Sequence, residues 1–134
     1  MCIVLREVRS GRACKILAMG TGNDCPLFGF LAKLRRDDQN EFARLRALLD
    51  RTADNGMVRN EQKFRFFNAE KVFEFKTRGG VRVMAFWDEG RVIICSHGFL
   101  KKSQKTPDGE LARAVSARGE YFANKLCERL KELQ

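Results

Sequence analysis

A chain of 134 residues, of which 44% are hydrophobic, is long enough to bury one core and too short for two ordinary domains. This composition excludes an intrinsically disordered chain. The net charge of +9 indicates a polyanionic partner, most often a nucleic acid, with an acidic protein, a membrane surface or a merely soluble basic surface as alternatives. No run approaches the roughly 20 apolar residues that span a bilayer, and no signal peptide is visible. We therefore expect a single domain over residues 1–134, in the cytoplasm and without a membrane partner.

The cysteines predict no metal site. They are five in number, with no CxxC spacing, and the chain has one histidine, so no zinc site of the usual spacing can be written. We expect neither a metal nor another cofactor. Cys95 lies in an apolar strand two residues before His97, and a catalytic Cys–His pair on one strand face is the alternative to a buried thiol.

The first half of the chain reads as two short strands followed by two helices. The segments 3–5 and 14–19 are apolar and can pair as a hairpin through Ser10 and Gly11. Asn23 or Asp24 then lies near the start of a helix with Pro26 in its first turn. A second helix begins near Asp38 and stops at Asn55-Gly56, so the two helices form a hairpin joined over residues 35–38.

From Lys71 the hydrophobic pattern changes to a period of two. The stretches KVFEFKT, VRVMAFW and RVIICSH read as three strands separated by short glycine turns, which is typical of an antiparallel meander. A last helix follows, with Thr106 as its cap and Pro107 at its first position. Its apolar positions run at helical spacing from Leu111 to Leu133.

Positive charge is concentrated on this meander. Residues 71–105 contain eight Lys or Arg against three Asp or Glu, which leaves +5 of the chain's net charge of +9. With the helices on one face of the sheet, we expect the other face to be open as a shallow basic surface for single-stranded RNA. Phe99 and Trp87 are candidates to stack on bases, and core packing is the alternative for both.

The same face carries groups that could cut RNA. Cleavage by the 2′-hydroxyl needs a group that takes its proton, positive charge at the phosphate, and an acid for the leaving oxygen. Glu74, Lys76, Arg82 and His97 come from three neighbouring strands, and lysines follow directly. The alternatives are a surface ion-pair ladder for Glu74 with its basic neighbours and a backbone-satisfied strand end for His97.

The region from about Pro26 to Tyr121 resembles the RelE/ParE toxin superfamily, and within it the phage-derived HigB-like branch. The resemblance lies in a strand with Glu74 flanked by hydrophobic residues, Arg82 on the next strand, and an ending of the form HxFxKKxxKxP before an Ala-containing helix. That ending is its most specific part and consists of His97, Phe99, Lys101, Lys102, Lys105 and Pro107. The order of helices and strands also agrees with an α+β, RelE-like fold, in which an antiparallel sheet carries a helical hairpin and a C-terminal helix.

The resemblance implies the toxin of a type II toxin–antitoxin pair, a metal-independent endoribonuclease that cuts mRNA, commonly on the ribosome. Its partner would be an antitoxin, commonly a helix-turn-helix protein. Carried over to this chain, Glu74, Arg82 and His97 would be catalytic, with Arg82 at the scissile phosphate and His97 or Glu74 as base or acid. The residues expected to bind RNA are Lys76, Phe99, Lys101, Lys102 and Lys105.

Two other functions remain open for a chain of this kind. The ParE branch of the superfamily poisons gyrase by binding it and cuts no RNA, and some phage-derived members lack activity. The sequence also departs from the pattern next to the glutamate, where Phe75 stands in place of a frequent basic residue and the lysine comes one position later. The alternative to a nuclease is therefore a non-catalytic binding protein.

Overall fold

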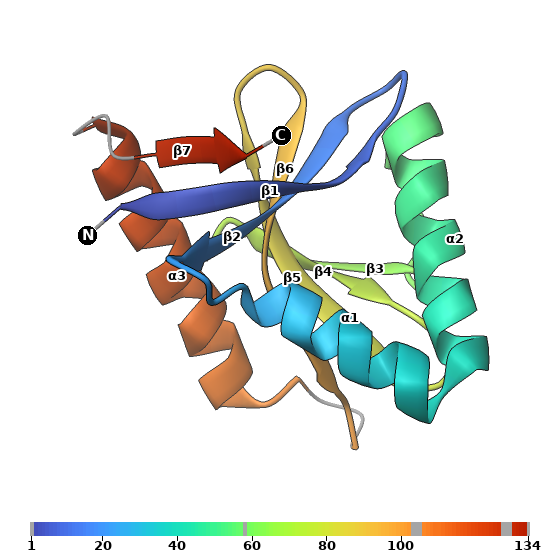
Figure 1. Ribbon diagram of the computed structural model, residues 1–134. Coiled ribbons are helices and arrows are strands. Elements are labelled where there is room, and N and C mark those ends of the chain that lie inside the picture. Colours follow the sequence, from blue (N-terminus) through green and yellow to red (C-terminus); the bar gives the residue numbers. More distant parts are fainter. Residues whose placement is uncertain (1, 58, 103–105, 127–129, 134) are drawn as a thin grey trace.

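The computed structural model describes residues 2–57, 59–102, 106–126 and 130–133, and it has the predicted α+β class (Figure 1). A single mostly antiparallel sheet of seven strands carries three helices, consistent with a RelE-like fold. The elements in chain order are β1 (Ile3–Ser10), β2 (Lys15–Thr21), α1 (Pro26–Asp37), α2 (Gln39–Asn55), β3 (Phe64–Phe67), β4 (Val72–Lys76), β5 (Val81–Asp88), β6 (Val92–Leu100), α3 (Asp108–Leu126) and β7 (Leu130–Leu133).

The predicted N-terminal hairpin is present as β1 and β2, which pair antiparallel. Their place in the sheet was not predicted. β2 also pairs with β6 in parallel, so the strand order is β3-β4-β5-β6-β2-β1-β7. A sequence pattern indicates strands and tight turns. It does not indicate which distant strand a hairpin pairs with, because that depends on tertiary packing.

The helical hairpin agrees with its prediction because its boundaries are locally encoded. Pro26 occupies the first turn of α1, and Asp38 caps α2 by accepting a hydrogen bond from the backbone N–H of Glu41 at 3.1 Å. α2 ends at Gly56, whose φ of 84° is a conformation that glycine adopts at little cost. The start of α1 differs slightly, since its N-cap is Cys25 without a side-chain hydrogen bond, rather than Asn23 or Asp24.

The meander is present as β4, β5 and β6, and two of its features differ from the prediction. β6 continues past His97 to Leu100. A further strand, β3, pairs antiparallel with β4 at the edge of the sheet. β3 has only four residues and follows a polar stretch, so it lacks the length that identifies a strand by its alternation.

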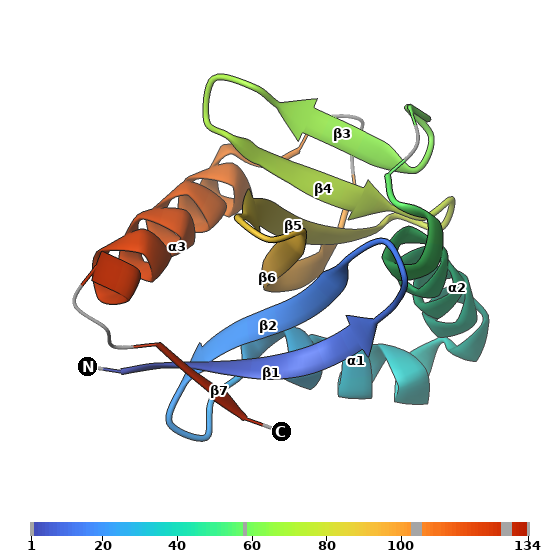
Figure 2. The same ribbon diagram turned by 90° about the horizontal axis from the view of Figure 1, so that it is seen from above.

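Helices cover both faces of the sheet, so the prediction that one face is open to solvent is wrong. α1 and α2 pack on one face over a core that includes Phe73, Phe75 and Val83, and α3 packs on the other over Met84 and Phe86. Figure 2 shows α3 on one side of the central strands and α2 on the other. The signal was in the sequence: VRVMAFW is apolar at nearly every position, which is typical of a strand buried on both faces.

The C-terminal segment also differs from its prediction. α3 ends at Leu126 rather than continuing to Leu133, and Leu130–Leu133 form β7, which pairs in parallel with β1. The leucine spacing fitted a helix, but as a strand this segment covers the free edge of β1 and packs Leu130 against the core on the α3 face. Among the described residues, no helix combines the length and apolarity that crossing a membrane would require.

Candidate functional site

Four of the predicted site residues come together on the α3 face, at the end of the sheet where α3 begins (Figure 1). The three strands β4, β5 and β6 each supply part of the group. Glu74 pairs across β4 and β5 with Met84, Met84 pairs with His97, and Arg82 pairs with Phe99. Because directly opposite residues of neighbouring strands point to the same face, Glu74, Arg82, His97 and Phe99 share one surface.

A β-bulge in β6 decides which face His97 occupies. The register opposite β5 shifts so that Ala85 pairs with Cys95 while the preceding Met84 pairs with His97. Cys95 therefore joins the core under α1 and α2, while His97 lies on the opposite face. The alternative of a catalytic Cys95–His97 pair on one strand face is wrong. Cys95 is fully buried, and this burial raises the pKa of its thiol far above the usual range.

Glu74 and Arg82 form a buried ion pair. The Nε atom of Arg82 lies 3.6 Å from Oε1 of Glu74, which is completely buried, while Arg82 is 9% exposed. Its Nη1 donates to the carbonyl oxygens of Thr77 at 3.0 Å and Val81 at 2.9 Å. Within the described residues, Nε has no hydrogen-bond acceptor. Burial lowers the pKa of Arg82, and the charge of Glu74 opposes that shift.

Thr106 covers this pair from the segment before α3. Its hydroxyl lies 3.2 Å from each carboxylate oxygen of Glu74 as a donor, and it accepts from Nη1 of Arg65 at 3.3 Å. A helix cap was predicted for Thr106, whereas α3 begins at Asp108 and the Thr106 hydroxyl contacts Glu74 and Arg65. Thr106 and Arg65 are neighbours of Glu74 that were not predicted. Arg65 pairs directly with Glu74, which only a predicted β3 could have revealed.

His97 is buried and neutral. Its Nδ1 lies 2.8 Å from Oγ of Ser96, and its ring stacks on Phe99 with centroids 6.0 Å apart. Oε1 of Glu110, from the first turn of α3, lies 3.3 Å from Nε2, but the geometry is not that of a hydrogen bond. Burial and then the charge of Arg113 lower the pKa of His97 to about 4. In this closed arrangement His97 is a weaker base than a histidine tuned to neutral pH.

The lysines predicted to bind RNA occupy different positions. Lys101 lies beside the buried pair: burial and then the charge of Arg82 lower its pKa, and its backbone N–H donates to the carbonyl of Gly80 at 2.7 Å. Lys76 lies at the end of β4 and its Nζ donates to the carbonyl of Glu61 at 2.7 Å. Lys102 is exposed, and Lys105 lies outside the described residues.

The two aromatic candidates separate. Phe99 is 7% exposed and packs in the core under α3, so a base reaches it only if that covering moves. Trp87 is 41% exposed and its ring lies 6.2 Å from that of Phe73, which belongs to the core on the other face. The two rings therefore do not form one stacking surface with His97.

The chemistry available at this site is that of acids, bases and cations. Five side chains lie around one end of the sheet: the carboxylate of Glu74, the guanidinium of Arg82, the imidazole of His97, the hydroxyl of Thr106 and the ammonium group of Lys101. In the part of the chain that the structure describes, no group of three or more His, Cys, Asp or Glu side chains could hold a metal ion.

A protein-family model matches most of the chain. Residues 30–118 match the family model described as phage-derived protein Gp49-like (DUF891). This segment runs from α1 to α3 and contains every site residue discussed above. No curated protein matches the chain significantly.

Proposed function

The chain belongs to the phage-derived Gp49-like proteins, a RelE-like, toxin-like family, and we propose that it is the toxin of a type II toxin–antitoxin pair that cuts mRNA. The observation that carries the proposal is the convergence of Glu74, Arg82 and His97 from three adjacent strands, with Lys101 beside them. Its partners would be a helix-turn-helix antitoxin of the HigB-associated type, the mRNA and the ribosome.

The proposed reaction is an internal transfer at the phosphodiester bond. A base takes the proton of the 2′-hydroxyl, and the 2′-oxygen forms a bond to phosphorus. The bond from phosphorus to the 5′-oxygen breaks, and that oxygen takes a proton from an acid, which leaves a 2′,3′-cyclic phosphate and a 5′-hydroxyl. Arg82 would stabilise the charge that develops on the phosphate, and Glu74 and His97 would exchange the protons.

The closed arrangement requires a movement before RNA can bind. Glu74 is completely buried and His97 is 1% exposed, under Thr106 and the first turn of α3. The scissile phosphate reaches Arg82 only when Thr106 leaves the Glu74 carboxylate. Once water or RNA replaces this covering, the pKa of His97 returns toward its ordinary value of about 6.5, where it serves well as a base.

The same burial favours the second candidate function, a non-catalytic binding protein that poisons gyrase or binds RNA or protein without cutting. A group that never leaves the core cannot exchange protons with a substrate. This function needs only the exposed charges of the chain and leaves Glu74 and Arg82 as a structural pair.

Induced expression followed by mapping of mRNA 5′ ends separates the two functions. We expect wild-type expression to arrest growth and to produce new 5′ ends in register with codons. Glu74→Gln keeps the size of the side chain but leaves Arg82 without its anionic partner, so its Tm should fall. At a temperature where circular dichroism shows this variant folded, it should make no cuts. Lys131→Ala, at the opposite edge of the sheet, should cut like the wild type.

Growth arrest with intact mRNA would reject the nuclease, and a gyrase supercoiling assay on the purified protein would then test the ParE-like function. If Glu74→Gln cut mRNA at the wild-type rate, the catalytic role of Glu74 would be rejected, but the nuclease activity would not. If a helix-turn-helix reading frame adjoins this gene and encodes the antitoxin, its co-expression should relieve the arrest.

A further inference from the structure

A second basic feature lies outside the candidate catalytic site. A pocket of about 340 Å³ opens between α2 and the ends of β3 and β4. No acidic side chain lines it, and the cationic side chains that do are Arg44, Arg51, Lys63, Lys76 and Arg78. A concave surface with one sign of charge concentrates its field and attracts ligands of the opposite sign.

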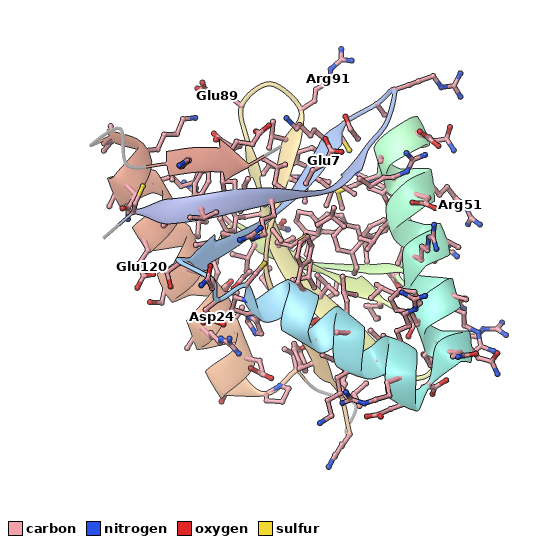
Figure 3. All side chains as sticks on the ribbon, in the orientation of Figure 1. Glu7, Asp24, Arg51, Glu89, Arg91 and Glu120 are labelled. Atoms are coloured by element: carbon pink, nitrogen blue, oxygen red, sulfur yellow. The ribbon has the colours of Figure 1, made fainter. Side chains whose placement is uncertain are left out.

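Most of this charge is free for an external ligand. Arg44 forms an ion pair with the buried Glu41, which also accepts a hydrogen bond from Thr77. Among the residues that the structure describes, Arg51, Lys63 and Arg78 form no ion pair. Arg51 points from α2 into solvent in Figure 3.

A row of cations joins the pocket to the candidate catalytic site. The backbone N–H of Lys76 donates to the carbonyl of Lys63 at 2.8 Å, and Lys76 pairs with Arg82 on β5. Lys63, just before β3, Lys76 on β4 and Arg82 on β5 therefore lie side by side. Neighbouring strands are about 4.8 Å apart, so the row spans roughly 10 Å. At about 3.4 Å per nucleotide along a stacked strand, this is the length of about three nucleotides.

We propose that the pocket binds the backbone phosphates of the RNA strand on one side of the phosphate held by Arg82. The inference rests on the proposed function for the identity of the strand. An arginine guanidinium can donate to two oxygens of one phosphate, and Arg51 and Arg78 supply two such groups to the pocket. Continuity with Arg82 is the reason to assign a nucleic-acid strand to the pocket rather than an acidic peptide.

The test measures binding separately from cutting. The probe is a fluorescein-labelled single-stranded 12-mer with 2′-O-methyl riboses, which has no 2′-hydroxyl to react. The variant R51A/K63A removes two pocket charges. The control R91A/K131A also removes two charges, from the turn between β5 and β6 and from β7, where Arg91 points into solvent like Arg51 (Figure 3).

We expect R51A/K63A to raise the Kd of the probe about tenfold and to reduce the slope of log K against log salt by about 1.4, as two lost phosphate contacts require. The control should change the Kd less than about twofold. An equal loss in both double variants, or no binding of the probe by the wild type, would overturn the proposal. So would a R51A/K63A variant that binds the RNA probe normally but loses binding of a hexaglutamate peptide.

The two proposals fail in different ways. If the wild type binds the probe with the expected difference between variants but leaves mRNA intact in cells, the pocket stands and the nuclease fails. If the wild type cuts mRNA and the two double variants bind alike, the nuclease stands and the pocket fails.

Discussion

Replacing Arg82 with methionine should strongly destabilise the protein, because it leaves the carboxylate of Glu74 buried without its cationic partner. Glu74 is completely buried, and its nearest cation is the Nε of Arg82 at 3.6 Å. Removing one partner of a buried ion pair costs about 3–5 kcal/mol. With an unfolding entropy of about 2.1 cal/mol/K per residue, a chain of 134 residues loses about 11 °C in Tm for a loss of 3 kcal/mol.

The double variant E74M/R82M should recover most of that loss. Methionine is apolar, flexible and close in size to both side chains, so neither charge remains in the core. Replacing both members of a buried pair with apolar residues is often neutral, or stabilising by about 1–4 kcal/mol. The expected result is therefore a strong coupling between the two positions in a double-mutant cycle measured by urea unfolding.

An exposed pair supplies the control. Arg9 and Asp50 form an ion pair at 3.0 Å with side chains 42% and 43% exposed, and Arg9→Met should cost under about 1 kcal/mol. The reasoning is refuted if R82M costs no more than R9M, or if E74M/R82M loses the sum of its two single variants. Either result would mean that water reaches Glu74 in the folded state.

Three further predictions concern single positions. His97 should make the free energy of unfolding fall as the pH drops from about 6.5 to about 4, because in that range only the unfolded chain protonates this histidine. In H97Q this part of the pH dependence should vanish when unfolding by urea is measured at pH 4.5, 5.5 and 7. If the free energies of wild type and H97Q changed with pH in parallel, the burial of His97 would be contradicted. Gly98→Ala should lower the free energy of unfolding by about 1–3 kcal/mol, because the new Cβ would lie 2.3 Å from Cδ2 of Phe30. In thermal unfolding, F30A/G98A should lose less stability than the sum of its two single variants. A Tm of G98A equal to that of the wild type would disprove the close contact. Thr106→Val should lower the free energy of unfolding by about 1–3 kcal/mol, because it leaves Glu74 without its hydroxyl donor. Thr106→Ser keeps the hydroxyl and should be as stable as the wild type. Equal Tm values for the two variants would show that the hydroxyl does not stabilise the carboxylate.

The parts of the fold that the sequence predicts correctly are those with local causes. Pro26 in a first turn, Asp38 at a cap and Gly56 at a positive φ each act within one turn of backbone, so the helical hairpin follows from adjacent residues. The alternation around Glu74 likewise fixes which strand residues share its face.

The parts that the sequence does not predict depend on distant partners. β7 forms because the edge of β1 is available to it, although its leucines also fit a continued helix. The bulge before His97 changes the face of every later residue in β6. Gly98 lies next to it, and an isolated glycine in a strand suggests a bulge, but the glycine alone does not say at which residue the register shifts. The prediction that Glu74, Arg82 and His97 share one sheet face is correct, but the predicted exposure of that face is wrong because α3 covers it.

The incomplete hydrogen bonding of the covered site favours a function that opens it. In the described part of the chain, Nε of Arg82 and Nε2 of His97 are the buried side-chain nitrogen or oxygen atoms without a hydrogen-bond partner. Such atoms are uncommon in folded proteins, and each leaves part of its desolvation penalty unrecovered. Both are able to donate to an oxygen, and phosphate oxygens would accept from both once Thr106 and Glu110 move aside. Opening gives up the contact between Thr106 and Glu74 but provides acceptors for both nitrogens, so the closed structure is compatible with the proposed RNA binding.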